Sequence, residues 1–254
     1  MDIKALLDEW VEKVNQPNFI ANDPIQIPHR FSKKQDIEIA GFFAAILAWG
    51  NRKSIINKCT DLLNRMDNAP FEFVTNANDE DLKRISGFVH RTFNDTDAWF
   101  LLNFLKKHYA EYDSLERAFS FGINPNDQTV QHGLEHFYNC VFGDQKIRTQ
   151  KHIATPYKKS ACKRLNMYLR WMVRKDNNGV DFGLWSAIKM NQLVCPLDVH
   201  VQKAASVLGL THRKQADWQT ALELTEVLKS FDAFDPVKYD FALFGMGVAG
   251  YLKN

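Results

Sequence analysis

The sequence predicts an all-α fold of about ten helices, and three observations support this prediction. Apolar residues recur at three- and four-residue steps along most of the 254 residues, which is the spacing that places side chains on one face of a helix. No segment alternates apolar and polar residues as a half-buried strand does, and no hairpin dipeptide joins two such segments. No internal repeat or low-complexity linker divides the chain, so a second lobe must be built from chain that leaves the first lobe and returns.

The N-terminal half contains three strong helix signals. Residues 1–14 have their apolar side chains on one face, and a proline-rich loop follows them. Residues 36–49 are so apolar that they predict a core helix, and an amphipathic helix follows at residues 54–66. Residues 95–111 begin with side chains that cap helices. Shorter helices are predicted at residues 71–74, 79–85, 114–121 and 129–142.

The C-terminal half begins with a basic loop that leads into a helix at residues 159–174. The Asn177–Asn178–Gly179 segment after it is a strong stop signal for a helix. Further helices are predicted at residues 184–188, 199–208, 217–229 and 237–251.

The composition indicates a globular protein rather than a disordered or membrane-spanning one. Of the residues, 45% are apolar and 24% are charged, and the net charge is only +2. The longest apolar run, residues 39–49, is too short to cross a bilayer. The charged N-terminus does not resemble a signal peptide. We therefore expect a cytoplasmic protein, with no membrane partner, that acts as a monomer.

The cysteines and histidines do not predict a metal site. The four cysteines are far apart and form no CxxC pair, so we expect reduced thiols and no zinc site or iron–sulfur cluster. His132 and His136 are four residues apart, but no third ligand is evident. We expect no metal and no other cofactor.

Residues 146–175 form a basic strip, a run with ten Lys or Arg and no Asp or Glu. On the helix within it, apolar residues should face the core, so that Lys163, Asn166, Arg170 and Arg174 share the opposite face. Such a stripe suits contacts with the phosphates of a nucleic acid. The alternative is a solvated helix face with snorkelling side chains. The candidate nucleic-acid contacts of the whole chain are Asn51, Arg52, Lys158, Lys159, Arg164, Arg170, Arg174 and His200.

Two residues are candidates for catalysis. Lys163 lies near a helix start, where the positive end of the helix disfavours an ammonium group, and a neutral lysine can attack an electrophilic sugar carbon to form a Schiff base. Asp198 follows Pro196 and precedes an apolar helix. A carboxylate held there could stabilise an oxocarbenium-like sugar cation. The alternatives are a surface lysine and a simple helix cap.

Almost the whole chain resembles a bacterial family of conserved hypothetical proteins of unknown function. The residues that carry this resemblance are RTFNDTDAWF at 91–100, CKRLNMYLRWMVR at 162–174, CPLDVHV at 195–201 and DPVKYDFALFGMGV at 235–248. More distantly, the chain is similar to the helix-hairpin-helix (HhH-GPD) DNA glycosylases of base excision repair. The segments that match are EIAGFFAAILAWGNRKS at 38–54, Lys163 at a helix start and Asp198 in a P-x-D-x-H-V-like segment.

The resemblance to the glycosylases implies two interlocked helical lobes, with the N-terminal helix joined to the C-terminal lobe. We place a central lobe in residues 37–145 and a second lobe, which carries the site, in residues 1–36 plus 146–254. The implied partner is duplex DNA with a flipped, damaged base between the lobes. Asp198 would stabilise the sugar cation, Lys163 would attack the anomeric carbon, and Asn51 with Arg52 would fill the gap left by the base.

This sequence departs from the glycosylase pattern in three respects. TPYKKSA, at residues 155–161, stands where a glycine-rich phosphate-binding hairpin is expected, and the four-cysteine iron–sulfur cluster is absent. Lys163 and Asp198 are 35 residues apart, more than in most bifunctional members and closer to the archaeal branch that acts on 8-oxoguanine. Two other functions stay open at this stage, a non-catalytic nucleic-acid-binding protein and a helical protein-interaction module.

Overall fold

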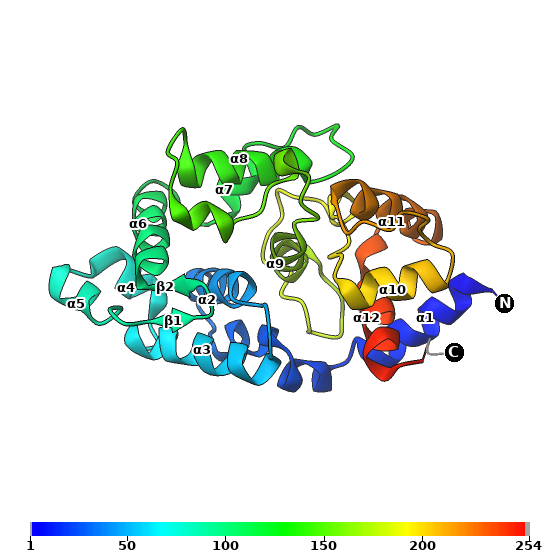
Figure 1. Ribbon diagram of the computed structural model, residues 1–254, viewed down its shortest axis with the longest axis horizontal. Coiled ribbons are helices and arrows are strands. Elements are labelled where there is room, and N and C mark those ends of the chain that lie inside the picture. Colours follow the sequence, from blue (N-terminus) through cyan, green and yellow to red (C-terminus); the bar gives the residue numbers. More distant parts are fainter. Residues whose placement is uncertain (1, 252–254) are drawn as a thin grey trace.

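The computed structural model describes residues 2–251 and is predominantly helical (Figure 1), which confirms the predicted all-α class. The α-helices of this part of the chain are α1 (Ile3–Val14), α2 (Lys34–Ile46), α3 (Arg52–Arg65), α4 (Pro70–Asn76), α5 (Asp79–Lys83), α6 (Asp95–Glu111), α7 (Glu116–Ser120), α8 (Gln131–Phe142), α9 (Lys163–Val173), α10 (Val199–Val207), α11 (Trp218–Phe231) and α12 (Tyr239–Ala249). Short 3-10 helices are η1 (Pro17–Asn22), η2 (Pro24–Gln26), η3 (Pro28–Arg30), η4 (Arg148–Lys151), η5 (Pro156–Lys158), η6 (Met190–Gln192) and η7 (Pro236–Lys238).

One predicted helix is absent from the structure, and one small hairpin was not predicted. Residues 184–188 form no helix, because the backbone N–H of Trp185 donates to the carbonyl of Met172 at the end of α9, 2.9 Å away. A small antiparallel hairpin, β1 (Val89–His90) and β2 (Phe93–Asn94), was not predicted. With two residues in each strand, it is too short to show an alternating pattern.

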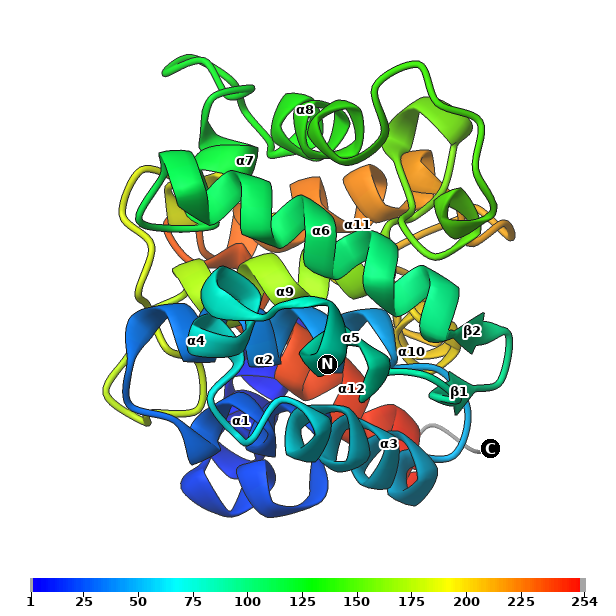
Figure 2. The ribbon, with the colours of Figure 1, turned by 90° about the vertical axis from the view of Figure 1, so that its left-hand side faces the viewer.

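Helix α9 lies between two groups of helices. In Figure 1, α3 to α6 lie on one side of it, and α1, α10, α11 and α12 lie on the other. Helix α2 packs against α9, whereas α12 packs against both α10 and α1. The N-terminal helix therefore joins the C-terminal segments, as expected, and Figure 2 shows α1 and α12 close together from a second direction. The division into lobes at residues 37 and 145 stays a prediction.

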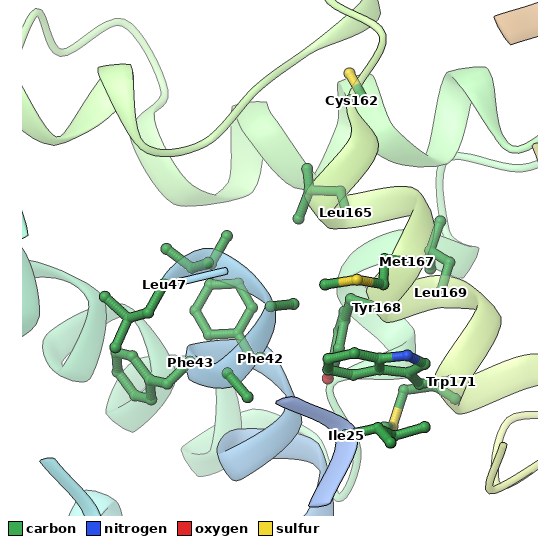
Figure 3. Packing of buried hydrophobic residues seen from close by; sticks show 14 of the residues in the cluster. Ile25, Phe42, Phe43, Leu47, Cys162, Leu165, Met167, Tyr168, Leu169 and Trp171 are labelled. Carbon is green, nitrogen blue, oxygen red and sulfur yellow. The ribbon is translucent and has the colours of Figure 1, made fainter. Parts of the chain in front are cut away.

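The contact between α2 and α9 is an aromatic core. Phe42 and Phe43 of α2 and Tyr168 and Trp171 of α9 are almost fully buried. Figure 3 shows Phe42 on the side of α2 that faces Tyr168, whereas Phe43 points away from α9. Phe42 and Tyr168 pack edge to face, with ring centroids 5.9 Å apart. Buried aromatic pairs of this kind contribute both area and orientation. The position of α9 relative to α2 is thereby fixed.

A buried carboxylate strengthens the same contact. Glu38 of α2 accepts hydrogen bonds from the hydroxyl of Tyr109 at 2.8 Å, from the hydroxyl of Ser114 and from the indole N–H of Trp185 at 2.7 Å. Its backbone carbonyl accepts one from the Tyr168 hydroxyl at 3.0 Å. A buried charge is tolerated when it is hydrogen-bonded in this way. The network links α2, α6, α9 and the segment that follows α9.

None of the described helices combines the length and the apolar composition that a membrane span requires.

Candidate functional site

The two candidate catalytic residues lie together. The Nζ atom of Lys163 is 4.0 Å from Oδ2 of Asp198, and the two side chains are 30% and 20% exposed. They belong to the first turn of α9 and to the residue before α10. The prediction that an amine and an acid 35 residues apart converge is therefore confirmed in its geometry. A catalytic role for either residue stays a prediction.

Asp198 is held as the cap of α10. Its Oδ1 atom accepts hydrogen bonds from the backbone N–H groups of His200 at 2.8 Å and Val201 at 2.9 Å. These bonds satisfy donors that a helix start otherwise leaves free. Because capping uses Oδ1, Oδ2 remains directed toward Lys163. The capping and catalytic interpretations of this carboxylate are compatible.

Lys163 is positioned by an unusual backbone. Helix α9 begins at Lys163 and not at residue 159, because Lys159 and Cys162 both have left-handed conformations, with φ of +59° and +50°. Such angles are costly for residues with a Cβ and are kept only where the surroundings enforce them. The surroundings include Trp218, whose backbone N–H donates to the carbonyl of Lys159 at 3.2 Å. The ammonium group of Lys163 also lies 3.6 Å from the sulfur of Met167.

A cleft of about 620 Å³ opens in front of this pair. Its volume lies within the range of sites that bind small organic ligands. Its walls come from the turn after α2, the start of α3, the first turns of α9 and α10, and α12. The aromatic and apolar residues of the wall include Trp49, Ile55, Met167, Leu197 and Phe244.

Three predicted nucleic-acid contacts line this cleft, namely Arg52, Arg164 and His200. The guanidinium of Arg52 lies 5.5 Å from the ring centroid of Phe244, and that of Arg164 lies 4.9 Å from Trp49. Arg164 also donates to the carbonyl of Ile46 at the end of α2. Burial lowers the pKa of Arg164 to about 10. The cleft thus combines cations with aromatic faces, a combination that suits nucleic acid.

A smaller cavity of about 40 Å³ continues inward from the same pair. Two further carboxyl groups line it, those of Asp23 and Asp240, together with the rings of Phe19 and Phe241. Burial raises the pKa of Asp240 to about 6, although Arg170 acts in the opposite direction. Burial also raises the pKa of Asp23.

Three other predicted contacts do not line the cleft. Lys158 is exposed and its ammonium donates to the hydroxyl of Tyr138 at 2.6 Å, in a separate cavity beside α8. Lys159 is exposed in the turn before α9. Asn51 caps α3, because its side-chain oxygen accepts from the N–H of Ser54 at 3.2 Å. Its exposed side chain stands between Gly50 and Arg52, which do line the cleft.

The prediction that Arg170 and Arg174 lie on an exposed stripe was wrong. They are only 4% and 2% exposed. The Nε atom of Arg170 lies 3.3 Å from a carboxylate oxygen of Asp181, and Nη1 of the same residue pairs with Asp240. The Nε atom of Arg174 lies 2.9 Å from Asp235. Because these carboxylates cover the guanidinium groups, neither arginine is free to bind a phosphate in this structure.

Asn166 was expected on the same stripe and is likewise only 1% exposed. Its side-chain N–H₂ donates to the carbonyl of Ala161, 3.1 Å away. The face of α9 opposite α2 is therefore covered along most of its length, and its solvent-accessible cations are confined to the first turn.

Several wall residues were not identified from the sequence. Asp23 lies in the proline-rich loop before α2, and Phe244 and Asp240 lie in a helix whose apolar residues indicated only packing. Met167 lies in α9, whose sequence drew attention to its cations and not to this side chain. The sequence does indicate a turn at Asp23, because an Asp before a proline often begins one. A turn signal does not reveal that the side chain lines a cavity. Among the described residues, no three His, Cys, Asp or Glu side chains are grouped so as to hold a metal ion.

A family model described as "Protein of unknown function (DUF2400)" matches residues 23–249. The chain belongs to this family. The match covers most of the chain, including Lys163, Asp198 and the helices that build the cleft, and confirms the expected membership of a family of unknown function. Comparisons with curated proteins and with solved structures found no match for the chain.

Proposed function

We propose that the protein is a DNA glycosylase of base excision repair, with an associated lyase step, that acts on a damaged base flipped out of duplex DNA. The observation that carries this proposal is the 4.0 Å approach of Lys163 and Asp198 at the wall of a cleft large enough for a nucleotide. The distant resemblance to HhH-GPD glycosylases assigns the same two positions.

Asp198 is suited to stabilise a positive charge on the sugar. Its Oδ1 atom is held by two backbone N–H groups, whereas Oδ2 faces the cleft wall near Lys163. As the bond between C1′ and the base breaks, positive charge develops on C1′ and the ring oxygen. A fixed carboxylate lowers the energy of that state without having to reorganise.

Lys163 is suited to attack the sugar carbon in the same step. After the ammonium group of Lys163 has given up a proton to water, the amine forms a C–N bond to C1′, the N-glycosidic bond breaks, and the electron pair leaves with the base, which takes up a proton. The nitrogen then loses a proton, the bond between C1′ and the ring oxygen breaks, the ring oxygen takes up a proton, and C1′ and the lysine nitrogen are left as a Schiff base. Loss of a proton from C2′ forms the C2′–C3′ double bond and expels the 3′ phosphate.

The rest of the cleft is suited to hold DNA. Arg52 and His200 are exposed at the cleft and can contact phosphates, whose charge supplies much of the affinity of DNA-binding proteins. The ring of Phe244 and the side chain of Met167 provide apolar surfaces for an everted base.

A base-release assay tests the proposal. The protein is incubated with duplexes that each carry one oxidised, deaminated or alkylated base, and the free base is measured. The proposal predicts release from at least one duplex, and loss of that release in Asp198→Asn, which keeps an oxygen that can cap α10. If no duplex in the panel releases a base, the enzymatic proposal is wrong. Salt-dependent binding without a product would then favour a non-catalytic DNA-binding protein, and absence of binding at low salt would favour a protein-interaction module.

A further inference from the structure

Asp23 is a carboxyl group that the proposed chemistry does not use. It lies between η1 and η2, and its Oδ1 atom accepts a hydrogen bond from the N–H of Ile25 at 3.0 Å. Within residues 2–251, no ion pair and no other side-chain hydrogen bond involves this carboxyl. One oxygen of Asp23 therefore keeps its capacity to accept a bond from a ligand.

Asp23 lines both the cleft and the inner cavity, as do Lys163, Met167, Asp198 and Phe244. These five residues form the boundary between the two spaces. Lys163 and Asp198 are assigned to the sugar, and Met167 and Phe244 offer apolar surfaces on which a planar ring can stack. Asp23 is the remaining polar group of this boundary, and the edge of a stacked ring is the part that needs a polar partner.

The surroundings of Asp23 favour a ligand that donates hydrogen bonds. Burial raises the pKa of this carboxyl, while the N–H of Ile25 and the more distant Arg170, Lys163 and Arg52 lower it. Burial is the largest of these effects, but the Asp23 side chain is half-buried, so its second oxygen is still reached by water from the cleft. A ligand N–H that replaces this water would give the oxygen a donor that the neighbouring residues do not supply.

We propose that Asp23 reads the edge of the everted base and selects bases that carry an exocyclic amine. This inference rests on the proposed function, because it takes the occupant of the cleft to be a base. An exocyclic amine donates N–H groups, as in adenine-, cytosine- and guanine-derived lesions. The ionised carboxylate only accepts, and a ligand N–H favours this ionised form, whereas an oxo group in the same place would bind only after the carboxyl had taken up a proton.

The test uses two pairs of lesions that differ at this group. The first pair is 5-hydroxycytosine and 5-hydroxyuracil, and the second is 8-oxoguanine and 8-oxohypoxanthine. For each duplex, dissociation constants are measured in the Asp198→Asn variant, where cleavage does not interfere, and kcat/KM is measured in the unchanged protein. We expect the amine-bearing member to be preferred roughly ten- to a hundredfold in at least one pair, the size of a good base contact.

Asp23→Asn, combined with Asp198→Asn for the binding measurement, is the decisive variant. The carboxamide oxygen can still accept from Ile25, so the turn is conserved, whereas the N–H₂ group now favours an oxo partner. Loss or reversal of the preference supports the inference, and an unchanged preference contradicts it. Equal binding of both members by the protein that retains Asp23 also contradicts it. A protein that binds the amine-bearing member more tightly but releases no base would overturn the glycosylase proposal and leave the reading role of Asp23 intact.

Discussion

The two ends of helix α9 carry similar charges and have opposite surroundings. In the first turn, Lys163 and Arg164 line the cleft, and Lys163 is 30% exposed. In the last turn and just after it, Arg170 and Arg174 are buried against carboxylates from three later segments of the chain. The same type of residue therefore serves the candidate site at one end and holds the fold together at the other.

The two ends of α9 differ in burial because different numbers of carboxylates lie close to their cations. Within residues 2–251, the carboxylate that lies within 4.0 Å of a cation in the first turn of α9 is Asp198, whose other oxygen is used in capping α10. Asp23 and Asp240 line the adjoining cavity without forming an ion pair with that turn. The carboxylates near the other end, Asp181, Asp235 and Asp240, have no counterpart in the basic strip itself. A local excess of cations in a sequence therefore predicts an anionic partner, but that partner can be another part of the same chain.

The largest loss of stability is expected when a buried cation near the C-terminal end of α9 is removed. Arg174→Met removes the cation that pairs with Asp176, Asp181 and Asp235, of which Asp181 still keeps Arg170. Removal of one partner from a buried ion pair typically costs about 3–5 kcal/mol. Urea denaturation should show this loss in the free energy of unfolding. The control is Lys175→Met, which removes an adjacent but exposed cation and should change the free energy by less than about 0.5 kcal/mol. Equal effects of the two variants would contradict the comparison.

A second effect is a pH dependence of stability that arises from Asp240, the carboxyl group paired with Arg170. The pKa of Asp240 is raised from 3.8 to about 6, so the folded state binds this proton more tightly than the unfolded state does. Between these two values the contribution of Asp240 to the free energy of unfolding should fall as pH rises. The measurement is the difference in this free energy between the unchanged protein and Asp240→Asn at several pH values. A difference that grows in favour of the unchanged protein as pH rises would be the opposite of what we expect.

Two substitutions of Asp198 distinguish its capping role from its proposed catalytic role. Their effect on the free energy of unfolding should be smaller than that of Arg174→Met. Asp198→Ala removes the acceptor of two backbone N–H groups and should cost about 1 kcal/mol, whereas Asp198→Asn should cost less because an oxygen remains. Thermal unfolding of the two variants measures this difference. Both variants should lose base release, and a fully active Asp198→Asn would leave capping as the sole role of the residue.

The smallest effect is expected for the salt dependence of DNA binding when Arg52, an exposed residue of the cleft wall, is replaced. Arg52→Gln should reduce the slope of the logarithm of the DNA binding constant against the logarithm of salt concentration by about 0.9, which corresponds to one phosphate contact. Lys13→Gln, on the exposed side of α1, is the matched control because it removes the same charge away from the cleft. An identical slope change in both variants would show that only net charge matters.

The sequence predicted the helical class and most of the helices, because apolar periodicity is a local property. It also predicted that Lys163 and Asp198 belong together, on the basis of an expected likeness to glycosylases that itself stays a prediction, and not through spacing alone. What it did not predict depends on contacts between distant segments. The exposure of Arg170 and Arg174 could not be judged without knowing where Asp235 and Asp240 pack.

The same reason explains the unpredicted residues of the cleft. Asp23 and Phe244 come from opposite ends of the sequence, and each has an ordinary local interpretation, a turn residue and a packing residue. Only the packing of α12 against α10, and of the loop before α2 near α9, brings them to one boundary. Helix ends were misjudged where Lys159 and Cys162 take left-handed conformations, which residue type alone rarely indicates.

The most direct test of the central claim is a trapping experiment with borohydride. The protein is mixed with a duplex from which it releases a base, borohydride is added to reduce any Schiff base, and the cross-linked peptide is identified by mass spectrometry. We predict a covalent adduct at Lys163, which disappears in Lys163→Gln and persists in Lys159→Gln, because Lys159 is exposed in the preceding turn and does not line the cleft. An adduct at another lysine, or base release without any adduct, would contradict the assignment of Lys163 as the nucleophile.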